Sequence, residues 1–178
     1  AEAGPKSGFF EKSLPAVHGQ LLHEPSVAIQ SATLKIPSIA LGQERVSFPV
    51  VFAIVAGMQI RRETEETFLI CLHRGELIRE CLQQACSEWG IFGGSVSGIG
   101  GVCEVELGFW RPPDYQRKTL AGNWELLSLL GNLSCYQGRP FAHLHVSLAD
   151  ENFQVVGGHF FEARVTATVE IFLKKTQP

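Results

Sequence analysis

The sequence predicts an α+β domain in which one helix lays a face on a mainly antiparallel β-sheet. Its length of 178 residues fits one domain with an appended arm better than two full domains. Helical periodicity is confined to one stretch near residues 76–89, whereas the remainder shows short apolar or alternating runs separated by turn residues. Strands joined by short turns form hairpins, and hairpins build antiparallel sheets.

Residues 1–62 are predicted to form an arm that precedes a domain at residues 63–175. The first 25 residues hold three prolines without sustained periodicity, which is typical of irregular structure. Two β-like runs follow at residues 26–36 and 45–56, and the charge cluster at residues 61–66 marks the boundary.

The domain is expected to begin with a strand, a helix and a second strand. A strand is predicted at Thr67–Leu72, and apolar residues then recur every three or four positions up to Trp89, with Gly90 suited to end a helix. A glycine-rich stretch at residues 93–101 follows. Beyond it, Val105, Leu107 and Phe109 alternate with Glu104 and Glu106, which predicts a half-buried strand.

Turn residues divide the rest of the chain into further strands. Turns are predicted at residues 111–114, 122–123 and 137–140. They separate a short polar strand at 115–120, an apolar run at 124–136 and a strand at 141–148. A loop at 149–153 closes a hairpin whose second arm runs over 154–163, and an alternating strand at 165–173 ends the domain.

Composition limits the classes of partner and location. The formal net charge of −3 and the pI of about 6.1 lack the basic excess that an autonomous DNA-binding domain needs. The apolar runs are shorter than the roughly 20 residues of a membrane span, so we expect a soluble protein without a membrane partner. Five cysteines, an odd number without a Cys-x-x-Cys pair, favour core packing in a reducing cytoplasm.

Three histidines carry the strongest chemical signal. His143 and His145 are two residues apart on a predicted strand, so both side chains leave the same face. If His143 lies opposite His159 across the hairpin, His145 is diagonal to it, and three imidazoles converge on one ion. The alternative is that these are ordinary half-buried histidines, hydrogen-bonded within a sheet.

The histidine set predicts a divalent transition metal. Three neutral imidazoles suit zinc first, and also iron, nickel or copper, and they leave a fourth position for water or a small-molecule ligand. Glu106 is a weak candidate for a general acid or base, although strand alternation also explains it. The glycines at 98–101 follow a helix and precede a strand, whereas a nucleotide-binding loop follows a strand and precedes a helix. They therefore do not predict a phosphate-binding site.

These same segments resemble the plants and prokaryotes conserved (PPC) domain family. The resemblance rests on Gly-Asn-Trp-Glu-Leu-Leu-Ser-Leu at 122–129, Gly-Arg-Pro-Phe-Ala-His-Leu-His-Val-Ser-Leu-Ala-Asp at 138–150 and Val-Gly-Gly-His at 156–159. Shorter matches stand at residues 75–76, 97–100 and 106–108, in the same order, and no counterpart is recognised for residues 1–62. The resemblance implies an antiparallel sheet flanked by helices and assembly as a homotrimer. It also implies a metal, which prokaryotic members bind through the histidines of the His-x-His and Gly-Gly-His motifs; in this chain these are His143, His145 and His159.

The resemblance also implies a DNA-binding or regulatory role, because plant members join this domain to an AT-hook with an Arg-Gly-Arg-Pro core. Here Gln137 stands in place of the first arginine, and Gln137–Pro140 is read as a turn. An arginine common in the first strand of prokaryotic relatives is replaced around Cys71, so this chain departs from the pattern there.

Two other functions stay open at this point. The predicted fold also resembles acetolactate decarboxylase, which implies a metal-dependent enzyme acting on a small oxygenated substrate. The other is a binding module in which the metal is structural or absent and the arm covers a partner subunit.

Overall fold

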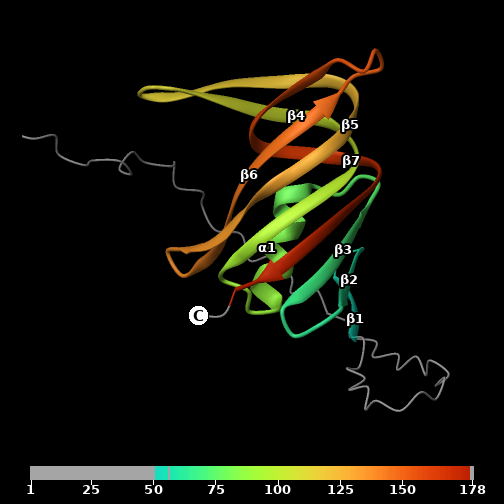
Figure 1. Ribbon diagram of the computed structural model, residues 1–178, viewed down its shortest axis with the longest axis vertical. Coiled ribbons are helices and arrows are strands. Elements are labelled where there is room, and N and C mark those ends of the chain that lie inside the picture. Colours follow the sequence, from blue (N-terminus) through green and yellow to red (C-terminus); the bar gives the residue numbers. More distant parts are fainter. Residues whose placement is uncertain (1–50, 56, 177–178) are drawn as a thin grey trace, which may run out of the picture.

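The computed structural model describes residues 51–55 and 57–176, and over these residues it shows one antiparallel sheet and one helix (Figure 1). This confirms the predicted fold class. The elements are β1 (Val51–Val55), β2 (Met58–Arg62), β3 (Thr67–His73), α1 (Ile78–Glu88), β4 (Gly94–Arg111), β5 (Asp114–Tyr136), β6 (Arg139–Ala149) and β7 (Val155–Lys175).

Strand β7 closes part of the sheet into a ring. The strand order is β1-β2-β3-β7-β4-β5-β6, and β7 additionally pairs with β6. It does so because it is 21 residues long: residues 155–159 pair with β6, 159–175 with β4 and 168–174 with β3. The two strands predicted at 154–163 and 165–173 are therefore one continuous strand.

The glycine-rich stretch belongs to β4, which starts ten residues earlier than the predicted strand at Glu104. A methyl carbon at Gly94 would lie 2.5 Å from the carbonyl oxygen of Lys174, and one at Gly100 would lie 2.3 Å from that of Thr168. Glycine thus allows β4 to lie against β7 where a side chain would collide with its backbone. The predicted alternation of buried and exposed side chains holds at Val105 and Leu107, which are buried, but not at Phe109, which is 71% exposed.

The turn predicted at residues 122–123 is wrong, because β5 runs through it. Gly122 has a φ of +83° and faces a register shift between Cys103 and Val105, where Glu104 also has a positive φ of +50°. Residue types that favour turns therefore lie here at a β-bulge, which bends the long β4–β5 hairpin. The turns at 111–114 and 137–140 are confirmed.

Helix α1 packs on the sheet and is fixed to β7 close to residue 160. It buries Ile78, Leu82 and Cys86, as its periodicity predicts. Its first turn is held by the carboxylate of Glu162, which accepts the N–H of Arg79 at 2.8 Å and of Glu80 at 3.2 Å. No helix in the described part of the chain is long and apolar enough to cross a membrane.

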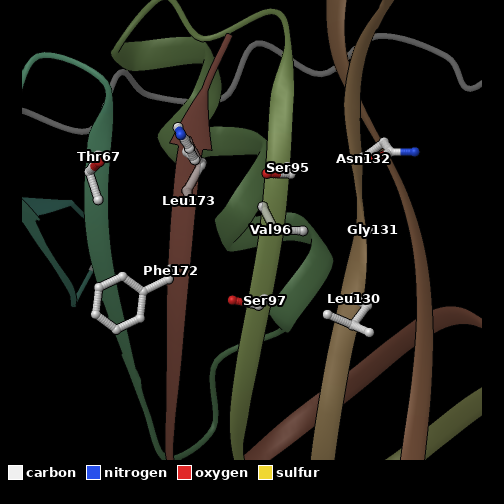
Figure 2. Close-up of a pocket in the computed structure, with 10 residues that line it drawn as sticks. Thr67, Ser95, Val96, Ser97, Leu130, Gly131, Asn132, Phe172 and Leu173 are labelled. Atoms are coloured by element: carbon white, nitrogen blue, oxygen red, sulfur yellow. The ribbon is translucent and has the colours of Figure 1, made fainter.

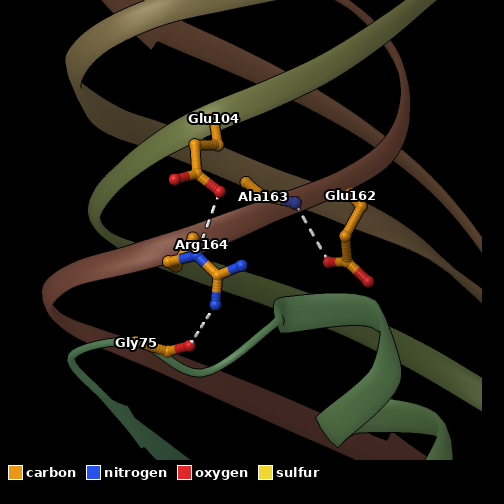
Figure 3. Close-up of polar contacts among 5 residues, drawn as sticks. All are labelled: Gly75, Glu104, Glu162, Ala163 and Arg164. Carbon is orange, nitrogen blue, oxygen red and sulfur yellow. Dashed lines mark hydrogen bonds and ion pairs between the residues drawn. The ribbon is translucent and has the colours of Figure 1, made fainter.

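Arg164 on β7 links strand β4 to the segment that precedes α1 (Figure 3). Its Nε donates to Glu104 in β4 at 3.0 Å, and its Nη1 donates to the carbonyl of Gly75, before α1, at 2.7 Å. Beside it, the Glu162 carboxylate accepts the N–H of Ala163 at 3.0 Å. These contacts fix the course of β7 beyond the ring that it closes.

The domain boundary predicted near residue 62 stays a prediction. Strands β1 and β2 come from within the predicted arm, and β2 pairs with β3 across that boundary. The β-like run at 26–36 and the first part of the run at 45–56 lie outside the described residues.

We expect Gly131→Ala to destabilise the protein by about 2 kcal/mol, the usual cost of overpacking. A methyl carbon there would lie 2.1 Å from the carbonyl oxygen of His143 and would separate β5 from β6. Urea denaturation measures the change. Gly101→Ala is the matched control, because its new methyl carbon would meet only the rotatable hydroxyl of Thr166. Equal stability of the two variants would contradict the prediction.

Candidate metal centre

The structure brings the three predicted histidines together on one outer face of the ring. His143 and His145 lie on β6, and His159 lies on β7. Their ring centroids are 5.1 to 5.3 Å apart. The candidate ligand atoms all lie within 4.8 Å of one another.

The predicted register is corrected by two residues. His145, not His143, lies directly opposite His159, and His143 is the diagonal neighbour. The loop after β6 explains this register, because the Asp150 carboxylate accepts the N–H of Asn152 at 2.9 Å and of Gln154 at 2.8 Å and so closes the hairpin at Ala149–Val155. A shift of two residues keeps the same face, and therefore the convergence survives.

The geometry suits closure around one ion after small side-chain rotations. Tetrahedral bonds of about 2.0–2.1 Å place ligand nitrogens roughly 3.4 Å apart. The candidate ligand atoms of the three histidines are spread over up to 4.8 Å, so they must move somewhat closer together. His143 and His145 are exposed, so their rings are free to turn toward His159. His159 is only 9% exposed and provides the fixed ligand.

The electrostatics of the site favour neutral imidazoles, the form that binds metal. Burial, followed by the proximity of His143, His145, Arg79 and Arg117, lowers the pKa of His159 to about 4. Burial and the neighbouring His143 also lower the pKa of His145. The Nδ1 atom of His159 is buried and has no hydrogen-bond partner among the residues that the structure describes, so a metal fits this otherwise uncompensated atom.

Aromatic rings enclose His159 on the side of β4 and β5. The ring of Tyr115 lies 4.7 Å from that of His159, and the ring of Phe161 lies 4.8 Å from it. Gly108, the β4 partner of His159, makes this possible, since a methyl carbon there would lie 2.5 Å from Phe161 and 2.9 Å from Tyr115. Sequence reasoning missed this wall; its one signal was a glycine inside an alternating strand.

Glu106, the weak catalytic candidate, forms an ion pair on the same face. Its carboxylate accepts a hydrogen bond from Arg117 at 2.9 Å. A general acid or base role for Glu106 stays a prediction. Of the other histidines, His73 lies on β3, whereas His18 and His23 fall outside the described residues.

A hollow of about 440 Å³ lies on the outer face of the sheet, lined by residues of β3, β4, β5 and β7 (Figure 2). Two of its lining residues, Leu130 and Asn132, are the β5 partners of His145 and His143. Phe172 and Ser97 line it from β7 and β4. The histidine site therefore continues into a broader surface over the sheet.

Comparison with known proteins agrees with the family expected from the sequence. Residues 59–177 match the model of the Plants and Prokaryotes Conserved (PCC) domain. The chain matches no curated protein sequence.

Solved structures share the fold. A plant- and prokaryote-conserved protein of Pyrococcus horikoshii is 32% identical, with a TM-score of 0.61 over 70% of this chain and 85% of that one. A metal-containing protein of Archaeoglobus fulgidus is 33% identical, with a TM-score of 0.59 over 64% of this chain and 81% of that one. A candidate DNA-binding protein of Bacteroides thetaiotaomicron has a TM-score of 0.65 at 24% identity over 68% of this chain and 85% of that one.

The expected likeness to acetolactate decarboxylase is present but weak. The Bacillus subtilis enzyme has a TM-score of 0.44 and 12% identity over 71% of this chain and 68% of that one. Such a likeness supports no inference about activity.

Without metal, we expect the free energy of unfolding to fall as the pH is lowered from about 6.5 to about 4, between the ordinary pKa of histidine and that of His159. The unfolded chain binds a proton in this range while folded His159 does not, so acid favours unfolding. Urea denaturation of chelator-treated protein at pH 7 and pH 5 measures the loss. His159→Asn should reduce it and His73→Asn should not; equal losses in all three proteins would refute this account.

Proposed function

The chain belongs to the Plants and Prokaryotes Conserved domain family, and from this premise we propose that it is a metal-binding member of that family. His143, His145 and His159 would hold one divalent transition metal and leave one coordination position open. The observation that carries the proposal is the convergence of three histidine side chains whose ligand atoms lie within 4.8 Å of one another. The metal-containing relative from Archaeoglobus fulgidus supports it.

Zinc is the best candidate for the ion. Three imidazoles without a thiolate or carboxylate suit zinc, and also accommodate iron, nickel or copper. Such an ion acts as a Lewis acid and lowers the pKa of a bound water to about 7. The chain contributes one buried ligand, two exposed ligands and an aromatic wall that limits water on the side of His159.

A DNA-associated regulatory role is the family-level proposal for this protein. It draws on the family resemblance and on the description of the Bacteroides thetaiotaomicron structure. The net charge of −3 gives it no electrostatic support, so any such role needs a local basic surface or a further partner.

The alternative is a metal-dependent enzyme that acts on a small oxygenated substrate. The open position of a three-histidine site favours it, because closed four-ligand sites are typical of structural zinc. Glu106 is the candidate for proton transfer, but its ion pair with Arg117 must open before it transfers a proton.

We also propose a homotrimer, the assembly implied by the family resemblance. Four large apolar side chains lie exposed on the outer face of the sheet and line one hollow: Ile99, Leu127, Leu130 and Phe172. A contiguous apolar patch of this kind is typical of an interaction surface.

The five cysteines are free, which supports a location in the reducing cytoplasm.

Purified protein loaded with Zn²⁺ and freed of excess should retain about one ion per chain. We expect His143→Ala and His159→Ala to lose most of it, with the larger loss for His159 because that ligand is buried. Elemental analysis measures the ratio, and His73→Ala is the control. Unchanged metal content in both triad variants would refute the metal site.

Binding to random duplex DNA should be weak at low salt and fall steeply as salt rises from about 50 to about 200 mM, because phosphate contacts release counterions. Fluorescence anisotropy of a labelled duplex measures the affinity. An absence of binding even at the lowest salt would contradict the DNA-associated role without affecting the metal site.

Light scattering after size exclusion should give three times the mass of the chain. Leu130→Glu places a charge within the apolar patch and should reduce the mass to that of one chain, whereas Leu127→Met should leave it unchanged. A single-chain mass for the unmodified protein would refute the trimer.

A further inference from the structure

We propose that the open position of the metal takes an elongated organic acid, and that Arg117 binds the far carboxylate of this ligand. The inference rests on the proposed metal site and specifies what that site receives. Three features carry it: the alignment of Arg117 with the histidines, the way its guanidinium is held, and the charge of a site without acidic ligands.

Arg117 stands in line with two of the histidines. Across four adjacent strands, Arg117 pairs with Gly108, Gly108 with His159, and His159 with His145. Directly paired residues of a sheet point to the same face. The arginine therefore shares the outer face of the ring with the histidine site, and between it and His159 lies Gly108, over which the rings of Tyr115 and Phe161 pack.

The guanidinium of Arg117 is positioned before any ligand arrives. Its central carbon lies 3.7 Å from the ring centroid of Phe161, and that ring lies 4.8 Å from the ring of His159. Glu106 accepts one hydrogen bond, from Nη1. A guanidinium has five N–H donors, so within the described part of the chain most are left for a second acceptor, and the Arg117 side chain is 57% exposed to receive it.

The space between the metal site and Arg117 has an aromatic floor. The rings of Tyr115 and Phe161 lie over Gly108, 5.4 Å apart, and meet His159 on one side. A ligand that reaches from the metal to Arg117 must cross these rings. The fitting ligand thus has an oxygen donor at one end, an apolar middle, and a carboxylate at the other end.

Charge favours an anion at both ends. Three neutral imidazoles leave the full double positive charge on the ion, whereas a carboxylate ligand would have reduced it. Arg117 adds a cation that Glu106 offsets only in part, since both groups are partly exposed. Arginine binds carboxylates through paired, charge-assisted hydrogen bonds, which gives the far end its specificity.

The test uses the full chain loaded with Co²⁺, whose visible spectrum reports both metal binding and changes in coordination. Glutarate is compared with pentanoate, which has the same chain length and one carboxylate fewer. Glutarate should bind at least about tenfold more tightly, the usual effect of a hydrogen bond to a charged group.

Three variants separate the inference from general effects of charge. Arg117→Gln should abolish the preference for glutarate while Co²⁺ still binds, and Glu106→Gln should increase glutarate affinity because it removes the competing carboxylate. Arg111→Gln, at the exposed end of the same hairpin, is the matched control and should change neither quantity.

The outcomes are distinguishable. Normal Co²⁺ binding without a preference for glutarate, or a preference that persists in Arg117→Gln, overturns the inference and leaves the metal site standing. Failure to bind Co²⁺ or Zn²⁺ at all overturns the proposed function, and the inference with it. Loss of preference in Arg117→Gln together with a gain in Glu106→Gln supports it.

Discussion

The candidate site depends on the pairing of one strand with several neighbours. Strand β7 pairs with β6 through residues 155–159 and with β4 from residue 159 onward, so His159 stands where three strands meet. The neighbour β6 brings His145 and His143, and the neighbour β4 brings Gly108, over which aromatic rings from β5 and β7 pack. Helix α1 and Glu162 fix the strand immediately beyond this junction.

Glycine makes these close approaches possible. At Gly100 and Gly131 the missing side chain lets neighbouring backbones pack, and at Gly108 it lets two aromatic rings cross a strand. These positions therefore contribute to the site although none offers a ligand atom. The cost is conformational entropy in the unfolded chain, which the long pairings of β4, β5 and β7 must offset.

Sequence reasoning identified what depends on local periodicity and missed what depends on long-range packing. The two-residue spacing of His143 and His145 sufficed to place them on one face, and the hairpin loop placed His159 near them. It misread Gly122 as a turn, because turn and bulge use the same residue chemistry. The exact register depended on the carboxylate of Asp150, and the Tyr115 part of the aromatic wall depended on a partner more than forty residues away along the chain. Such contacts leave no periodic signal.

The unequal exposure of the three histidines has a kinetic consequence. His159 lies on the same outer face of the ring but is covered by the rings of Tyr115 and Phe161, whereas His143 and His145 are exposed on β6. An ion would thus enter and leave through the rotation of two surface side chains, with the third ligand already in place. Release of the metal would require its bonds to these two exposed ligands to break but would not require the sheet to unfold, so the ion would stay in equilibrium with the supply around it.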